Sequence, residues 1–218
     1  MMGKSQLSLA ETVAKLNHVA VGIEASKDIL TEADIAIGDG DHGIGMARGF
    51  EAVRGKLATE SFTSLDQLFK TVGTTLMGTM GGASGAIFGT LFRGGSKQLV
   101  NQTVFTSESL ALLLGDGLQA IKERGKAKVG DKTMVDALEP AALKAKELSA
   151  APLDDALPAA AEAARQGMEY TKTIVATMGR AKTLGERALG HPDPGAVSMS
   201  LILNYMAEYV TQNTTPDD

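Results

Sequence analysis

Hydrophobic positions recur at the three-to-four-residue spacing of amphipathic helices along most of this chain. The first series runs from Leu9 to Leu30. Ser8 and Glu11, at its start, have the spacing of an N-terminal capping box. We therefore expect one helix from Ser8 to just past Leu30. The same reasoning predicts helices at about 44–57, 65–76, 84–91, 107–124, 134–149, 153–176 and 195–210.

Some helix ends carry more specific signals. Ser64 and Gln67 form a second predicted capping box before the helix at 65–76, and Gly125 is expected to act as the C-cap of the helix at 107–124. Alternation typical of β-strands is nearly absent, apart from the short stretch Thr103–Phe105. The prediction is an all-α, mostly antiparallel assembly of eight helices, forming a single domain over residues 1–218.

The segment from Thr71 to Phe92 contains no charged residue and is long enough to span a membrane. Its many Gly, Ser and Thr residues make it too polar for a stable lipid-facing helix, so we expect a helix end, a Gly-rich turn and a buried helix instead. The first residues lack the apolar stretch of a signal peptide. A cytoplasmic protein with no membrane partner is the expectation.

Composition excludes several functional classes. The chain has no Cys, which excludes a disulfide framework, a thiolate zinc site, an iron–sulfur cluster and a cysteine nucleophile. A net charge of −5 and a pI near 5.3 argue against a broad face that binds nucleic acid directly. Any phosphate binding must therefore depend on a metal ion or on a few local cations.

An acidic, Gly-rich joint at residues 34–45 is the first candidate site. It places Asp34, Asp39 and Asp41 within eight residues, and two carboxylates ~6 Å apart repel by about 3 kcal/mol at an effective dielectric constant near 20. Either the loop is a solvated turn or it holds a hard cation such as Mg²⁺, Ca²⁺ or Mn²⁺. An EF-hand is excluded, because Phe50 stands where that loop requires a bidentate Glu.

Glycine patterns give a second candidate. Gly38, Gly40 and Gly43 match the spacing of a dinucleotide-binding fingerprint, but no strand precedes them and two Asp residues lie within the motif, so we reject that reading. The turn Gly81–Gly85 precedes a predicted helix, whose free N–H groups attract anions such as phosphate. The structural alternative is a glycine-rich turn with Ser84 as the N-cap.

Two further loops concentrate polar residues. One is residues 184–195, which follow Arg180, and the other is residues 130–134, which contain Lys132. Arg180 and Lys132 could equally be members of ordinary surface ion pairs. His42 has two interpretations as well, a loop histidine paired with a neighbouring Asp or a contact to phosphate or to the metal shell.

These motifs occur together in a known family. In order, ADIAIGDGDHGIGMARGF, GTMGGASGAIFGTLF, ERGKAKVGDKTMVDALEP and GRAKTLGERALGHPDPGAVS resemble the four blocks of the nucleotide-binding L subunit of dihydroxyacetone kinase. The resemblance covers residues 30–200. It implies an eight-helix antiparallel barrel whose loops at one end hold ADP or ATP with two Mg²⁺ ions.

The resemblance also assigns roles residue by residue. Catalytic roles fall on Asp34, Asp39, Asp41 and Arg180, and the three Asp residues are the implied Mg²⁺ ligands. The implied nucleotide-binding positions are His42, Gly43, Ile44, Gly45, Ala83, Ser84, Gly125, Met134, Arg180, Pro192, Asp193 and Pro194.

The implied function is that of a kinase subunit. A K-type subunit would hold dihydroxyacetone, and the phosphoryl donor is either free ATP or, with a phosphocarrier subunit as further partner, a relay onto permanently bound ADP. The alternatives are a kinase subunit for a tetrulose such as erythrulose, a nucleotide-loaded module that regulates a transcription factor, and a metal-stabilised helical scaffold. The chain departs from the family at Gly45, Lys182, Thr183 and Pro192, of which Lys182 and Thr183 bear on the surface that meets the K subunit.

Overall fold

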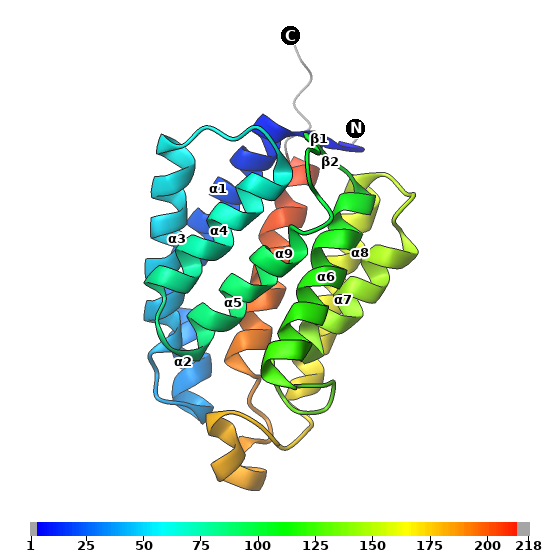
Figure 1. Ribbon diagram of the computed structural model, residues 1–218. Coiled ribbons are helices and arrows are strands. Elements are labelled where there is room, and N and C mark those ends of the chain that lie inside the picture. Colours follow the sequence, from blue (N-terminus) through cyan, green and yellow to red (C-terminus); the bar gives the residue numbers. More distant parts are fainter. Residues whose placement is uncertain (1–3, 213–218) are drawn as a thin grey trace.

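The computed structural model describes residues 4–212 and is mostly helical (Figure 1). Its α-helices are α1 (Leu9–Ala25), α2 (Lys27–Ile37), α3 (His42–Thr59), α4 (Leu65–Thr79), α5 (Gly82–Gly95), α6 (Ser107–Gly125), α7 (Val135–Glu147), α8 (Leu153–Thr171) and α9 (Pro194–Gln212). A 3₁₀-helix, η1 (Arg180–Ala188), precedes α9, and two short strands, β1 (Leu7–Ser8) and β2 (Val104–Phe105), pair antiparallel. The all-α fold class is confirmed.

Consecutive helices pack side by side around one apolar core. From α3 to α9 each helix contacts the next, and α1 contacts both α9 and α3, so the packing order closes on itself. The core extends from Leu7 to Val210 and consists mainly of Leu, Val, Ala, Met and Phe side chains. Small residues allow the closest approaches: a Cβ on Gly73 of α4 would lie 2.7 Å from the carbonyl oxygen of Gly89 on α5.

The predicted first helix is wrong in one respect, because it is two helices that meet at Ser26. The Ser26 hydroxyl lies 2.8 Å from the Gly22 carbonyl oxygen and 2.8 Å from the hydroxyl of Tyr205 on α9. A side chain that bonds back to the preceding turn bends a helix. The break redirects α2 toward the lower end of the molecule in Figure 1, where the acidic loop begins.

Other local predictions gave mixed results. The capping box of Ser8 and Glu11 is confirmed, as is the extended stretch that ends at Phe105. The predicted box of Ser64 and Gln67 is wrong: the Ser64 hydroxyl donates to Asp66, and the Gln67 side-chain oxygen accepts from the Thr63 N–H group.

Three further boundaries differ from the prediction. The residue with left-handed φ after α6 is Lys126 rather than Gly125, which is still helical. Helix α8 ends at Thr171 rather than near 176, and the residues that follow lead into η1, which no pattern predicted. Residues 71–92 form the end of α4, the turn and most of α5, and no helix within residues 4–212 is long and apolar enough to cross a membrane.

One charged side chain lies inside the core. Lys15 of α1 is fully buried, and its ammonium group has no hydrogen-bond partner among the described residues. The ammonium nitrogen lies 3.4 Å from the centroid of the Phe105 ring, and this cation–π contact offsets part of the lost hydration. Burial lowers the pKa of Lys15 well below its ordinary value.

Replacing Lys15 with Met should stabilise the protein, because it removes an unsatisfied buried ammonium group and keeps most of the packing volume. We expect the free energy of unfolding to rise by about 1–3 kcal/mol. Between the lowered pKa of Lys15 in the folded state and the pKa of about 10.4 in the unfolded state, the unfolded chain binds one proton more than the folded chain. The wild-type protein therefore gains stability as the pH rises through that window, and the stability advantage of Lys15→Met shrinks.

Denaturant unfolding of both proteins at several pH values between about 6 and 10 measures this effect. Lys97→Met is the matched control, since Lys97 is exposed and surface substitutions change stability by about 0.5 kcal/mol or less. A Lys15→Met variant that is less stable than the wild type at the lower pH values contradicts the prediction.

Candidate nucleotide and metal site

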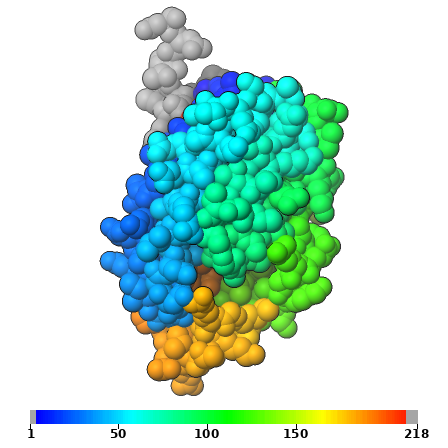
Figure 2. All heavy atoms as spheres, turned by 60° about the vertical axis from the view of Figure 1, so that its left-hand side comes forward, coloured from blue at the N-terminus to red at the C-terminus, as the bar shows by residue number. Residues whose placement is uncertain are grey.

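The loops at the lower end of the bundle enclose a cavity of about 660 Å³, a typical volume for a small-molecule site. Figure 2 shows the hollow between the orange segment that contains η1 and the helices above it. Most of the predicted site residues line this cavity: Asp34, Asp39, Asp41, His42, Ile44, Gly45, Ala83, Ser84, Gly125, Met134, Arg180, Asp193 and Pro194. Segments that are far apart in the sequence therefore meet at one place.

Two predicted residues are not among those that line the cavity. Gly43 is buried where α3 approaches α2, and a Cβ on it would lie 2.3 Å from the Lys27 carbonyl oxygen. Its position is explained by packing. Pro192 is half-buried in the segment that leads into α9.

The three carboxylates converge. Asp34 lies in the last turns of α2, Asp39 in the loop and Asp41 at the N-cap position of α3, and one oxygen of each lies within 4.8 Å of the others. At that separation two full charges repel by about 3.5 kcal/mol at an effective dielectric constant near 20. Asp34 is buried while Asp39 and Asp41 are exposed, so a cation could reach the cluster from the cavity.

Two contacts hold this cluster in place. The Asp34 carboxylate accepts a hydrogen bond of 3.1 Å from the backbone N–H of His42, at the start of α3, where a negative charge is favourable. Asp39 forms an ion pair with Arg180 of η1. The turn between Asp39 and Asp41 depends on Gly40, which has a left-handed φ of 79°.

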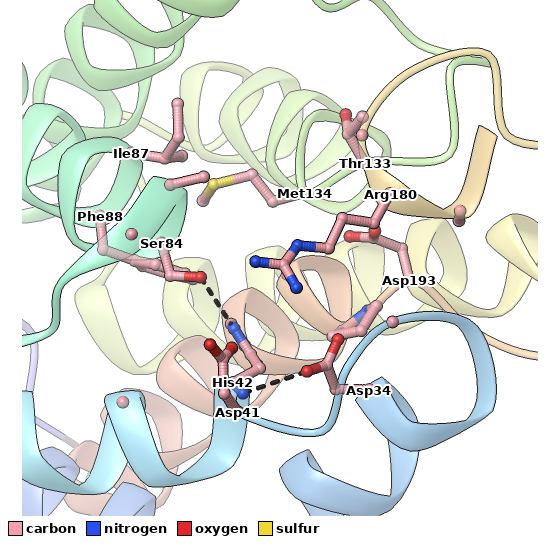
Figure 3. A pocket seen from close by; sticks show the side chains of 18 of the residues that line it. Asp34, Asp41, His42, Ser84, Ile87, Phe88, Thr133, Met134, Arg180 and Asp193 are labelled. Atoms are coloured by element: carbon pink, nitrogen blue, oxygen red, sulfur yellow. Dashed lines mark hydrogen bonds between the residues drawn. The ribbon is translucent and has the colours of Figure 1, made fainter. Parts of the chain in front are cut away.

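His42 links the acidic loop to two other helices (Figure 3). Its Nδ1 lies 3.0 Å from the Ser84 hydroxyl on α5, and its Nε2 lies 2.7 Å from the Ser198 hydroxyl on α9. Burial lowers the pKa of His42, although the nearby Asp34 carboxylate opposes this shift. The His42 ring thus bridges Ser84 at the cavity wall to Ser198 on α9, and neither sequence interpretation of His42 included this bridge.

The N-terminus of α5 opens onto the cavity. Gly81 and Gly82 have left-handed φ values of 74° and 57°, and a Cβ on Gly82 would meet nothing within 4 Å. The first N–H groups of a helix have no intrahelical acceptor and favour anions. Arg48 of α3 supports this turn, because its guanidinium donates to the Thr79 and Met80 carbonyl oxygens at 2.7 and 2.6 Å.

The other side of the cavity is apolar. Ile87, Phe88, Ile121, Ala127 and Met134 line it. Figure 3 shows Ile87 and Met134 across the cavity from Asp34 and Asp41, with the Arg180 guanidinium between them. The cavity therefore has one acidic end and one apolar end.

Asp193 borders the cavity just before α9. Its carboxylate accepts a hydrogen bond of 2.8 Å from the Ala196 N–H group, and Pro194 is the first residue of α9. The surrounding protein desolvates the carboxyl group and raises the pKa of Asp193 to about 7, and the neighbouring Asp136 adds to the shift.

Several lining residues were absent from the sequence predictions. Sequence reasoning missed Arg48, Phe88, Thr133 and Met178 among them. Arg48 had a detectable signal, since it is the one basic residue in the block that follows the three Asp residues. The surface ion-pair interpretation of Lys132 is wrong, because its side chain is 1% exposed.

Comparisons with known proteins identify a domain family and several similar kinase subunits. Residues 36–208 match the DAK2 domain family. The chain is 40% identical over 195 residues to the ADP-binding subunit of PEP-dependent dihydroxyacetone kinase 1 from Listeria innocua, an alignment that covers 88% of this chain and 92% of that protein. It is 38% identical over 204 residues to the ADP-binding subunit of the PTS-dependent dihydroxyacetone kinase from Lactococcus lactis, covering 94% and 99% respectively.

A solved structure is similar as well. The dihydroxyacetone kinase from C. freundii, in complex with AMP-PNP and Mg²⁺, aligns with a TM-score of 0.70 at 29% sequence identity. The alignment covers 90% of this chain and 33% of that one, so this chain spans about a third of that kinase.

The acidic cluster predicts that the protein binds a divalent cation and that each of the three carboxylates contributes to the affinity. Even residues behind direct metal ligands change affinity by about 10–100-fold, so we expect Asp39→Ala or Asp41→Ala to weaken Mg²⁺ binding by about tenfold or more. Titration calorimetry with Mg²⁺, with and without ADP, measures this. Asp28→Ala, an exposed position at the start of α2, is the control, and unchanged Mg²⁺ affinity in both site variants would sink the assignment.

Proposed function

The chain belongs to the DAK2 domain family, and we propose that it is the nucleotide-binding subunit of a dihydroxyacetone-type kinase. It holds ADP or ATP with Mg²⁺ and delivers a phosphoryl group to a small hydroxyketone on a partner K subunit. One observation carries this proposal: a single cavity combines an acidic cluster, a free helix N-terminus and an apolar recess. These suit a metal ion, phosphate groups and a nucleobase.

The residues present fit Mg²⁺. Asp34, Asp39 and Asp41 supply only oxygen ligands, and their mutual repulsion is relieved by a divalent cation. When bound, Mg²⁺ neutralises the negative charge of the nucleotide phosphates and polarises the transferred group. Two ions are the family expectation, and three carboxylates around an open cavity are compatible with it.

The protein groups around the cavity position the phosphates. The N–H groups at the start of α5 and the Ser84 hydroxyl, oriented by His42, face the space beside the acidic cluster. Arg180 presents a guanidinium between the two ends of the cavity (Figure 3) and can stabilise charge that develops during transfer. No nucleophile from this chain is needed, because the acceptor hydroxyl belongs to the ketose on the partner.

The closed packing order of the helices supports the eight-helix antiparallel barrel that the family resemblance implies, with α2 as an extra helix beside the site. We treat residues 1–218 as one nucleotide-binding domain that works in the cytoplasm. The partner would approach the cavity end. Lys182 and Thr183 of η1 are exposed there, so we place them in the contact surface.

Between the two donor modes, we favour the relay onto bound ADP, with a phosphocarrier subunit as the further partner. The two relatives at 38–40% identity, whose full length this chain nearly covers, are named ADP-binding subunits of PEP- or PTS-dependent kinases. The C. freundii kinase with AMP-PNP is less similar, at 29% identity.

The relay mode predicts that ADP stays bound through purification. Denaturing the purified protein and identifying the released nucleotide by mass spectrometry should give about one ADP per chain. Exchange against added ATP should be slow, because permanently bound ADP has a very low dissociation rate. Release of no nucleotide, together with no binding of added ADP or ATP, would contradict the whole proposal.

A further prediction is that the chain alone does not phosphorylate a hydroxyketone. Phosphoryl transfer depends on in-line positioning of the acceptor, which the K subunit provides. The assay supplies the chain with Mg²⁺, a phosphoryl donor and dihydroxyacetone or erythrulose, before and after addition of a K-type subunit. The ketose that turns over faster identifies the substrate.

The same assay tests the contact surface. Lys182→Glu should weaken the complex with the K subunit more than it weakens nucleotide binding. Lys146→Glu, at the opposite end of α7 from the cavity, should leave both unchanged. Robust turnover by the isolated chain would show that it contains its own acceptor site.

A further inference from the structure

We propose that Lys132 is a positioning residue whose ammonium group holds together both ends of the segment 171–191 and thereby keeps Arg180 over the cavity. Lys132 lies in the loop between α6 and α7 and is 1% exposed. The proposal rests on the proposed function for the identity of the ligand. The set of hydrogen bonds from Lys132 to this segment, which we call the clamp, is defined by contacts within the protein.

A single nitrogen atom reaches both ends of the segment. Lys132 Nζ lies 2.6 Å from the Thr171 carbonyl oxygen, 2.8 Å from that of Ala188 and 2.6 Å from that of His191. A fourth carbonyl, of Ile174, lies at 3.3 Å. Thr171 and Ile174 precede η1, whereas His191 follows it. The ammonium group therefore joins the two ends of this segment, and we call this junction the neck.

This arrangement leaves no donor for a ligand. An ammonium group has three N–H donors, and three short bonds to carbonyl oxygens use all of them. Burial lowers the pKa of Lys132, while the nearby Asp193 and Asp136 carboxylates favour its charged form. Although Lys132 borders the cavity, it therefore acts on the protein backbone rather than on a phosphate group.

Apolar packing contributes little to the position of η1. Its buried residues are Ala181 and Ala188, which belong to a small apolar cluster with Ile37 and Ala176 that is separate from the main core. Segments with few buried apolar contacts open locally at low free energy. Polar bonds at the neck must therefore supply much of the order of this segment.

Neighbouring polar contacts support the same junction. The Thr177 hydroxyl donates to the Asp131 carboxylate at 2.5 Å, and the Gly190 N–H donates to the Lys172 carbonyl oxygen at 2.8 Å. The backbone of Lys132 has a φ of 60°, a left-handed conformation that is unfavourable for residues other than glycine. Glycine would adopt this conformation without strain but has no ammonium group to close the neck.

The clamp matters for the site because of Arg180. Arg180 is the first residue of η1 and forms the ion pair with Asp39 across the mouth of the cavity. If the neck opens, this guanidinium loses its fixed position relative to the acidic cluster. Lys132 thus acts through Arg180.

The first test needs no added ligand. In the protein as purified, Lys132→Met should increase hydrogen exchange of the backbone amides in residues 172–190 by about tenfold or more, and leave the amides of α3 to α6 unchanged. Lys128→Met is the matched control, since Lys128 is an exposed lysine in the same loop. Unchanged exchange in residues 172–190 overturns the proposal.

The second test asks whether Lys132 acts through Arg180. We expect Lys132→Met and Arg180→Ala each to raise the ADP dissociation rate by about tenfold. The double variant should release ADP no faster than the faster single variant, because both changes remove the same contact. Additive effects, or faster release with normal exchange in residues 172–190, would instead make Lys132 a direct ligand contact.

The two tests separate the possible failures. If wild-type protein binds no nucleotide, the proposed function fails, but the exchange experiment still decides whether the clamp exists. If Lys132→Met does not fold, Thr177→Val serves as the second variant, because it removes the hydroxyl that donates to Asp131 and should loosen the junction without changing the lysine. In this variant, NMR measures two exchange rates, that of the backbone amides in residues 172–190 and that of the Lys132 ammonium protons. Both rates should increase by the same factor, and an increase of the amide rate alone overturns the clamp.

Discussion

The repulsion among Asp34, Asp39 and Asp41 is the constraint around which this end of the molecule is organised. Their oxygens lie within 4.8 Å of one another, a spacing that requires compensating positive charge or partial positive charge close by. The first turn of α3 provides one partner through the His42 N–H group, and Arg180 provides another from a distant part of the chain. In the proposed function, a divalent cation would supply the charge that these two partners leave uncompensated.

The remaining cations near the cavity are already engaged by the backbone. Arg48 donates to carbonyl oxygens at the C-terminus of α4, and Lys132 donates to those at the neck of the 171–191 segment. Both side chains thus stabilise helix ends and loops, and the three N–H donors of Lys132 are all used by the backbone. Under the proposed function, a protein of net charge −5 would hold phosphate groups through the helix N-terminus of α5, a divalent cation and Arg180 rather than through many free basic side chains.

Local amphipathic patterns allowed much of the fold to be predicted, and the family resemblance anticipated most of the residues that were named for the site and that line the cavity. Amphipathic periodicity located most of the helices, and the spacing of the three Asp residues indicated a cation site before any geometry was known. The errors have two causes. The break at Ser26 depends on Tyr205 and the burial of Lys132 depends on carbonyl groups of residues 171–191, and such tertiary partners are not displayed by a single sequence. The lost capping box at Ser64 instead reflects a local competitor, because Asp66, two residues away, accepts a hydrogen bond from the Ser64 hydroxyl.

The neck at Lys132 also has a consequence for how such a protein can change over time. Since the carbonyl groups of Thr171 and His191 meet at one ammonium group, the two ends of the intervening segment lie close together. Exposed residues between them that do not line the cavity, such as Lys182 and Thr183, can be exchanged while the helical scaffold keeps the same anchor points. The outer face of this segment can therefore diverge to fit a different partner surface, provided that the residues lining the cavity, such as Arg180, are kept.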